Sequence, residues 1–273
     1  MDNKLRIGII GAGRIGKLHA NNLVNRVPGA EVAAISDVVI EAAQALAEQL
    51  GVAKYTADYK EIINDPSIDA VFICSSTNTH SPISVEAAQA GKHIFCEKPI
   101  DHDLDKIRVV LEEVKKAGVK YQVGFNRRFD RNFKHVQEVV KAGGIGDVHM
   151  VKITSRDPSA PPLSYVRVSG GIFVDMTIHD FDMARYLSGS EVVEVSAFGA
   201  CLVNPDIAKE KPLYFFLERY NDAFIQESND FVNACLNGAE TPVGAFDGLQ
   251  PVLIAIAAKE SCEKGGIPVK VGI

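Results

Sequence analysis

Short apolar runs and longer amphipathic stretches alternate along the first half of the chain. This alternation is typical of parallel strands joined by crossover helices. The run 70–74, Ala-Val-Phe-Ile-Cys, is apolar at every position, as expected for a strand buried on both faces of a sheet. The predicted strands are residues 6–10, 32–35, 70–74, 93–96 and 120–124, and the predicted helices are residues 17–24, 41–50, 59–63, 84–90 and 104–117.

From residue 125 the elements become fewer and more widely spaced. Helical periodicity marks residues 132–141, 172–187, 214–237 and 248–264, and strand-like patterns mark residues 148–155, 192–202 and 267–271. We therefore predict two domains: an α/β domain with a doubly wound parallel sheet at residues 1–124, and a second domain of helices and strands at residues 125–273.

The first predicted strand ends in Gly11-Ala12-Gly13-Arg14-Ile15-Gly16, a GxGxxG sequence between a strand and a helix. Gly11 permits the tight turn, Gly13 lets a pyrophosphate approach the backbone, and Gly16 lets the helix pack closely on the strand. Asp37 follows the second strand, about 20 residues past the last glycine, where a carboxylate binds ribose hydroxyls. The alternative is a glycine-rich turn of an unrelated α/β protein, but the strand–helix context favours a dinucleotide site.

Two polar segments follow predicted strands. The segment from Ser75 to His80 comes after the strand 70–74, at an end of the sheet where open α/β folds bind ligands. Glu97-Lys98-Pro99 comes after the strand 93–96, and Pro99 keeps Lys98 extended, so that its ammonium can bind a substrate hydroxyl or polarise a carbonyl. The alternative is a lysine in solvent that pairs with Glu97, and these residues alone leave both open.

Asp175 and His179 are four residues apart in the predicted helix 172–187, which would place them on one helix face. A carboxylate beside an imidazole orients the ring and favours its protonated form, which suits a general base near neutral pH. No third ligand stands at a recognisable spacing, so no metal site is predicted. The alternative is a helix N-terminal acid beside a structural histidine. His19 is expected to be packed or hydrogen-bonded, and Arg127-Arg128 to pair with acids or phosphates or to lie on the surface.

Composition narrows the class of protein. The 273 residues, 47% hydrophobic and 23% charged, are those of an ordinary globular protein. The net charge of −6 gives no reason to expect nucleic acid or an anionic membrane as a partner. No apolar stretch reaches the ~18 residues of a membrane span, and we expect no signal peptide. The five widely spaced cysteines are expected to be reduced thiols of a cytoplasmic protein.

Together these motifs resemble the glucose–fructose oxidoreductase and inositol dehydrogenase family. The resemblance spans almost the whole chain, in the family's order, and rests on the glycine loop, Thr77-Asn78-Thr79-His80, Glu97-Lys98-Pro99, Asn126-Arg127-Arg128-Phe129-Asp130, and Gly170-Gly171 followed by Asp175 and His179. It implies a Rossmann domain followed by an α+β domain with an antiparallel sheet. It also implies NAD-dependent oxidation of a cyclic polyol or sugar hydroxyl to a ketone, most similar to the myo-inositol 2-dehydrogenase reaction, by a homo-oligomer (a dimer or tetramer).

The resemblance also implies residue roles. His179 would take the hydroxyl proton, Asp175 would hold the substrate and the imidazole, and Lys98 would orient the reacting oxygen. Asp37, followed by Val38 rather than a basic residue, would select NAD, and Arg156-Asp157-Pro158 resembles a substrate-side loop. The expected cofactor contacts are Gly11, Gly13, Arg14, Ile15, Gly16, Asp37, Ser75, Thr77, Asn78, His80, Glu97, Lys98 and Arg127, and the expected substrate contacts are Lys98, Arg127, Asp157, Asp175 and His179.

The chain departs from the family between residues 202 and 214, where relatives carry several further strands. A shortened sheet would spare the cofactor site but would affect the substrate wall and the subunit contacts. Three alternatives therefore stay open: another sugar oxidoreductase, an NAD-using glycosidase of the same family, and an NAD-binding scaffold without turnover. Activity on glycosides would identify the glycosidase, and NAD binding without polyol oxidation would identify the scaffold.

Overall fold

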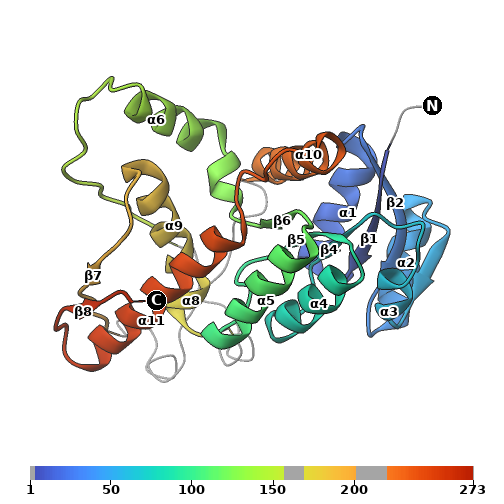
Figure 1. The fold of residues 1–273 in the computed structure, drawn as a ribbon, viewed down its shortest axis with the longest axis horizontal. Coiled ribbons are helices and arrows are strands. Elements are labelled where there is room, and N and C mark those ends of the chain that lie inside the picture. Colours follow the sequence, from blue (N-terminus) through green and yellow to red (C-terminus); the bar gives the residue numbers. More distant parts are fainter. Residues whose placement is uncertain (1–3, 157–168, 201–219, 273) are drawn as a thin grey trace. The chain divides into compact units, whose positions relative to one another are not determined.

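Six parallel strands form the sheet of the first half of the chain, in the order β3-β2-β1-β4-β5-β6 (Figure 1). The computed structural model describes residues 4–156, 169–200 and 220–272, which fall into two units: Met1–Asn126 with Asp222–Gly248, and Arg127–Asn221 with Leu249–Ile273. The strand order reverses between β1 and β4, the switch point of a doubly wound sheet. The strands are β1 (Leu5–Ile10), β2 (Ala30–Ser36), β3 (Lys54–Thr56), β4 (Ala70–Ile73), β5 (His93–Cys96) and β6 (Tyr121–Val123).

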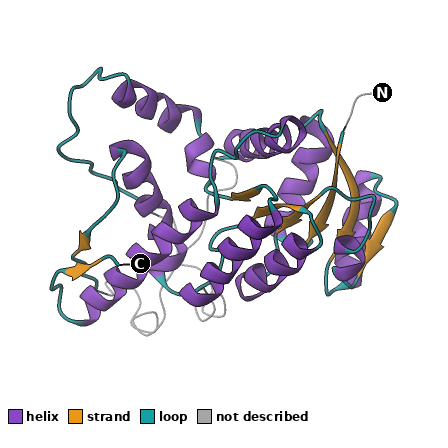
Figure 2. Cartoon of the chain, viewed as in Figure 1, coloured by secondary structure: helices purple, strands orange, loops and turns teal. Residues whose placement is uncertain are grey.

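Helices cover both faces of this sheet (Figures 1 and 2). On one face α1, α2 and α10 share a hydrophobic core with β1, in which Ile9, Leu23 and Phe231 are fully buried. On the other face α4 and α5 lie side by side, as the reversal of strand order requires when the crossovers are right-handed. The helices are α1 (Arg14–Arg26), α2 (Ile40–Leu50), α3 (Lys60–Ile63), α4 (Thr77–Gln89), α5 (Leu104–Ala117) and α10 (Asn221–Asn237).

The helix α10 belongs to the first unit although it follows the second unit in the sequence. Its Phe224 and Phe231 are buried, and the Phe231 ring packs edge-on against Phe72 and Phe95 of the sheet. Its backbone also receives a hydrogen bond from β6, because Gln122 Nε2 donates to the carbonyl of Glu227 at 2.8 Å. The helix is therefore part of the core of the nucleotide-binding fold.

Two sequence expectations in the first unit differ from the structure. The segment from Ser75 to His80, which precedes the predicted helix 84–90, already forms the first turn of α4 at Thr77, and the helix continues through Pro82. The prediction was wrong because polar side chains and a proline are poor helix formers, whereas tertiary hydrogen bonds of His80 hold this turn. The strand β3 was missed because three residues are too few to show a pattern.

The second unit is mainly helical in its described part. It contains η1 (Asn126–Phe129), α6 (Arg131–Lys141), α8 (Ile172–Asp175), α9 (Thr177–Ser188) and most of α11 (Ala245–Glu263). β7 (Glu194–Val195) and β8 (Val269–Lys270) form a small antiparallel sheet, which confirms the predicted fold class. None of the helices in the described ranges is long and apolar enough to cross a membrane.

The predicted strand at residues 148–155 is wrong. These residues form no strand, and Met150 is 86% exposed. Alternating side chains produce a strand only where a partner strand completes the backbone hydrogen bonds, and no described strand pairs with this segment. The start of the predicted helix 214–237 and the end of the predicted strand 192–202 lie outside the described residues.

The predicted helix 172–187 is two helices. α8 ends at Asp175 and α9 begins at Thr177, and the N–H of His179 donates to the carbonyl of Met176 at 3.1 Å. The Thr177 hydroxyl donates to the carbonyl of Ile172 at 3.0 Å, so it replaces part of the interrupted ladder. Asp175 and His179 therefore lie in different helices, and the premise of one continuous helix was wrong.

Candidate active site

The three glycines of the turn from β1 into α1 have different surroundings. Gly11 has a φ of 104°, and a Cβ there would lie 2.7 Å from the backbone of Cys74 and Ser75. A Cβ on Gly16 would lie 1.9 Å from the carbonyl oxygen of Gly11. A Cβ on Gly13, in contrast, would have no atom of the described residues within 4 Å, and Gly13 is exposed. The first and third glycines thus close the turn, and the second leaves open backbone that a phosphate can approach.

The surroundings of this opening fit a dinucleotide. Gly13 begins α1 without a side-chain cap, so the N–H groups of the first turn, which includes Arg14 and Ile15, point toward the opening. Asp37, after β2, accepts hydrogen bonds from the N–H groups of Ala12 at 2.7 Å and Val39 at 2.9 Å. A carboxylate has about four acceptor positions, so Asp37 keeps two for ribose hydroxyls while it holds the loop.

His80 connects the start of α4 to the segment after β5. Its ring is buried, with Nδ1 2.8 Å from the carbonyl oxygen of Pro99 and Nε2 3.1 Å from that of Ser75. Carbonyl oxygens only accept, so both nitrogens bear hydrogen when both bonds form. Burial opposes the charge, but the neighbouring Cys96 and the two carbonyls outweigh it and raise the pKa of His80 to about 9. His80 is thus a buried cation that fixes two strand-end segments.

The other polar residues of this segment lie at the start of α4. The Ser75 hydroxyl is 2.6 Å from that of Thr79, which donates to the carbonyl of Ser76 at 2.6 Å. Thr77 is half-buried and Asn78 is exposed in the first turn of the helix. Because β1 and β4 are neighbours in the sheet, their carboxyl ends bring this turn beside the glycine loop.

Glu97 and Lys98 directly follow β5, the next strand in the sheet. Lys98 is half-buried, and the Lys98–Pro99 peptide is cis. Glu97 is buried, and its Oε1 lies 2.8 Å from His19 Nε2, so its carboxylate faces α1. A Cβ on Gly124, at the end of β6, would lie 3.1 Å from the Glu97 carboxyl carbon. The glycine therefore leaves room for this buried carboxylate.

Asp175 and His179 lie in the second unit. Asp175 is the last residue of α8 and is buried, whereas His179 is in the first turn of α9 and half-buried. Beside His179, the Asp180 carboxylate accepts from Arg127 Nη1 at 2.5 Å and from the Ser155 hydroxyl at 2.6 Å. Asp180 thus brings Arg127 to the start of α9.

A second arginine is anchored two residues further along α9. Arg128 donates through Nε at 2.8 Å and Nη2 at 2.6 Å to the two carboxylate oxygens of Asp182, whose side chain is 1% exposed. This two-point geometry fixes both side chains. The sequence analysis left the partners of Arg127-Arg128 open and missed both acids. The available signal was the pair Asp180 and Asp182, spaced to serve two adjacent arginines.

The predicted site residues thus fall into two groups. The first unit gathers the glycine loop, Asp37, the start of α4, Glu97 and Lys98 at the carboxyl ends of neighbouring strands. The second unit holds Arg127, Asp175 and His179. Arg156 is exposed, and Asp157 lies outside the described residues.

Comparisons with known proteins match both parts of the chain. An oxidoreductase family with an NAD-binding Rossmann fold matches residues 5–125, and the GFO/IDH/MocA C-terminal domain matches residues 133–238. An oxidoreductase of Bacillus subtilis (strain 168) is 41% identical over 335 residues, which cover 99% of this chain and 98% of the relative. A myo-inositol 2-dehydrogenase of Thermotoga maritima is 41% identical over 324 residues, which cover 95% of this chain and 97% of the relative.

A solved structure is similar over almost the whole chain. The scyllo-inositol dehydrogenase of Lactobacillus casei, with bound NAD(H) and scyllo-inositol, is 29% identical with a TM-score of 0.88, and the match covers 98% of this chain and 99% of that one. Both curated alignments are longer than this chain of 273 residues, so those relatives hold residues that it lacks, in line with the expected shortening. The expected position of the shortening lies mostly outside the described residues. The chain belongs to the GFO/IDH/MocA oxidoreductase family, as an NAD-dependent oxidoreductase whose first unit is the NAD-binding Rossmann fold.

Proposed function

We propose that the chain oxidises a ring hydroxyl of a cyclic polyol, with myo-inositol as the first candidate, to a ketone. The observation that carries this proposal is the 41% identity to the Thermotoga myo-inositol 2-dehydrogenase over 95% of the chain. The inositol-bound relative from Lactobacillus casei supports the same substrate class. When bound, NAD supplies the hydride acceptor, and the protein supplies position and a proton acceptor.

The first unit would hold the cofactor. Gly11, Gly13 and Gly16 form the opening for the pyrophosphate, and Arg14 and Ile15 offer backbone N–H groups at the start of α1. Asp37 would accept from the ribose hydroxyls and repel a 2′-phosphate, which favours NAD over NADP. The remaining expected cofactor contacts are Ser75, Thr77, Asn78, His80, Glu97, Lys98 and Arg127.

The proposal also assigns the proton chemistry. Oxidation of an alcohol releases a proton from the hydroxyl as the hydride leaves carbon. His179 would accept that proton, Asp175 would hold the imidazole and the substrate, and Lys98 would donate a hydrogen bond to the reacting oxygen. Arg127 and Asp157 would contact other hydroxyls of the polyol. The position of Arg127 is set by Asp180, next to His179 in the sequence.

The proposal assigns cofactor binding to residues 1–124 and substrate binding and oligomerisation to residues 125–273. It describes a cytoplasmic homo-oligomer, a dimer or tetramer. Size-exclusion chromatography with light scattering tests the assembly, and a monomer would contradict it. If the protein is a monomer that still turns over an inositol, the shortened sheet affects subunit assembly but not catalysis.

The decisive experiment is a turnover assay of the purified chain with NAD. We expect NADH formation with myo-inositol or scyllo-inositol and less with open-chain polyols. A panel of nitrophenyl glycosides distinguishes a glycosidase from a polyol dehydrogenase, because only the glycosidase releases nitrophenol. Calorimetry with NAD distinguishes an enzyme from an NAD-binding scaffold. NAD binding without turnover of any polyol or sugar would support the scaffold.

A further inference from the structure

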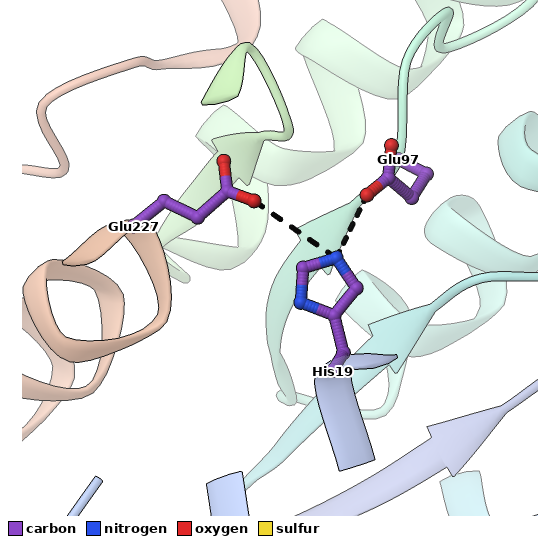
Figure 3. A group of neighbouring side chains, drawn as sticks. All are labelled: His19, Glu97 and Glu227. Atoms are coloured by element: carbon purple, nitrogen blue, oxygen red, sulfur yellow. Dashed lines mark hydrogen bonds and ion pairs between the residues drawn. The ribbon is translucent and has the colours of Figure 1, made fainter. Parts of the chain in front are cut away.

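Three ionisable side chains meet in the interior of the first unit (Figure 3). His19 comes from α1, Glu97 from the end of β5 and Glu227 from α10. His19 Nε2 lies 2.8 Å from Glu97 Oε1 and 3.9 Å from Glu227 Oε1. His19 and Glu227 are 0% exposed, and Glu97 is 7% exposed. These residues are distant in sequence and are brought together because α10 packs into the first unit.

The surroundings of the three residues are apolar on one side. The His19 ring lies 4.9 Å from the centroid of Phe95 and 5.6 Å from those of Phe72 and Phe224. Its Nδ1 is 3.5 Å from the Ser228 hydroxyl, which donates its hydrogen to the carbonyl of Phe224. The ring is thus held with Nε2 toward both carboxyl groups.

Glu227 is the member whose polar atoms are least satisfied. Both of its carboxyl oxygens are buried without a hydrogen-bond partner among the described residues. The hydrogen bond between His19 and Glu97 needs one proton, which the ring nitrogen can supply. A second ionised carboxylate here would be buried beside a first one, with one imidazole between them. Buried charges of like sign are strongly disfavoured, so one carboxyl group keeps its proton.

The local electrostatics also identify Glu227 as the protonated carboxyl group. Burial and the nearby Glu97 charge raise the pKa of Glu227 well above its usual range. Cys74, at the end of β4, also interacts with both glutamates, and burial and the Glu97 charge raise the pKa of its thiol, which leaves it neutral. Among the described groups around Glu227, the proton therefore resides on Glu227 itself.

We propose that His19, Glu97 and Glu227 form a proton-sharing cluster in which Glu227 is the protonated member, and that His19 and Glu227 are positioning residues for Glu97 and Lys98. The protonated state of Glu227 stands independently of the reaction, whereas the positioning role rests on the proposed function. With Glu227 neutral, the His19 hydrogen bond goes to Glu97 and fixes the residue that precedes Lys98. An ionised Glu227 repels the Glu97 carboxylate and competes for the same hydrogen.

A bound divalent cation is the competing occupant of this cluster. Metal ligands at ~2.0–2.2 Å from a tetrahedral ion lie more than ~3 Å apart. The 2.8 Å between His19 Nε2 and Glu97 Oε1 is instead the length of a hydrogen bond. The geometry therefore favours a proton between these two atoms.

Infrared spectroscopy of the full chain tests the protonation state directly. A buried protonated carboxyl group has a C=O stretch that ionised carboxylates lack. We expect this band in the difference spectrum of wild type minus Glu227→Gln at neutral pH, and we expect it to fade in the wild type as the pH is raised into the alkaline range. An absent band overturns the cluster, and so does one divalent metal ion per chain in elemental analysis of the purified protein. The wild-type titration decides the question even if the variant does not fold.

The positioning role is tested by the pH dependence of NAD affinity. We expect NAD affinity of the wild type to fall about tenfold per unit of pH above the pKa of Glu227, and this slope to flatten in Glu227→Gln, which cannot ionise. Asp230→Asn is the matched control, because Asp230 lies on the same helix and pairs with Gln226 on the surface. Equal slopes in all three proteins overturn the positioning role. If no polyol is turned over while the infrared band and the NAD slope are as expected, the proposed substrate is wrong and the cluster stands.

Discussion

The two units hold their polar groups by different means. In the first unit, backbone geometry decides: glycines close a turn, neighbouring strands end at one edge, and Gly124 makes room for Glu97. In the described part of the second unit, paired charges decide: Arg127 with Asp180, Arg128 with Asp182, and Arg185 with Glu191. From this difference we expect substitutions that add atoms at glycines to disturb the first unit most. Substitutions that remove a paired charge should disturb the second unit most.

The contrast follows from the sheets. A parallel sheet of six strands aligns its carboxyl ends without help from side chains. The described sheet of the second unit has two strands of two residues each, so it aligns little beyond itself. Ion pairs link its helices instead, with Arg128 joining the 3-10 helix η1 to α9.

The largest expected effect is on catalysis by the second unit. His179→Ala should lower turnover about 10²–10⁴-fold, the usual range for loss of a general base, and leave NAD affinity unchanged because the first unit holds the cofactor. Steady-state kinetics and calorimetry measure the two quantities. Lys98→Met should also lower turnover, by misplacing the substrate oxygen. Full turnover in His179→Ala would place the base elsewhere.

The next effect concerns the charged pairs. Asp182→Ala removes a carboxylate that is 1% exposed and should destabilise the protein by about 3–5 kcal/mol, because the Arg128 guanidinium, 11% exposed, loses both hydrogen bonds to it. Glu260→Ala is the control, since in its pair with Lys264 the two side chains are 47% and 55% exposed and such pairs contribute about 0–1 kcal/mol. Urea unfolding followed by circular dichroism measures both. An equal loss of unfolding free energy in the two variants would contradict the expectation that the pair of Arg128 and Asp182 stabilises the second unit more than an exposed pair does.

A pair of glycine variants tests the first unit. Gly16→Ala places a methyl group against the Gly11 carbonyl and should cost about 1–3 kcal/mol of stability. Gly13→Ala has open space around its new methyl group, so its melting temperature should not change, but its NAD affinity should fall. Thermal unfolding and calorimetry separate these outcomes. Undiminished NAD affinity in Gly13→Ala would mean that the pyrophosphate does not approach this backbone.

The smallest effect is on cofactor selectivity. Asp37→Ala should narrow the preference for NAD over NADP by about tenfold, because it removes charge-assisted hydrogen bonds to the ribose and the repulsion of a 2′-phosphate. Asp37→Asn is the milder variant, since its amide oxygen can still accept from the N–H of Ala12. Titration of each protein with both cofactors measures the ratio. Tighter binding of NADP than NAD by the wild type would contradict the assignment of Asp37.

The sequence predicted the central strands of the first unit well because strands such as β4 are buried on both faces. A run such as 70–74 carries the whole signal of a strand in its own residues. The segment 148–155 failed for the opposite reason, since its alternation depends on a partner strand that the segment itself does not encode. The break at Met176 also escaped prediction, because the residues on either side keep a helical spacing.

The candidate site shows the same limit. The glycine loop and Asp37 were predictable because the spacing of a strand, a turn and a helix fixes their geometry. The partners of Arg127 and Arg128, and the meeting of His19 with Glu227, depend on contacts between distant segments. No local pattern around His19 points to a carboxyl group on α10.

The return of α10 to the first unit has a consequence for how the protein is made. A ribosome completes all six strands of the Rossmann sheet long before it reaches residues 222–248, which supply Phe231 to the core and a carbonyl at Val243 to the N–H of Val123 on β6. Until then the nascent sheet lacks the helix that covers Phe72 and Phe95. The NAD-binding fold of this chain therefore matures only after most of the second unit has been synthesised, and cutting the chain after residue 126 would not release it as an intact domain.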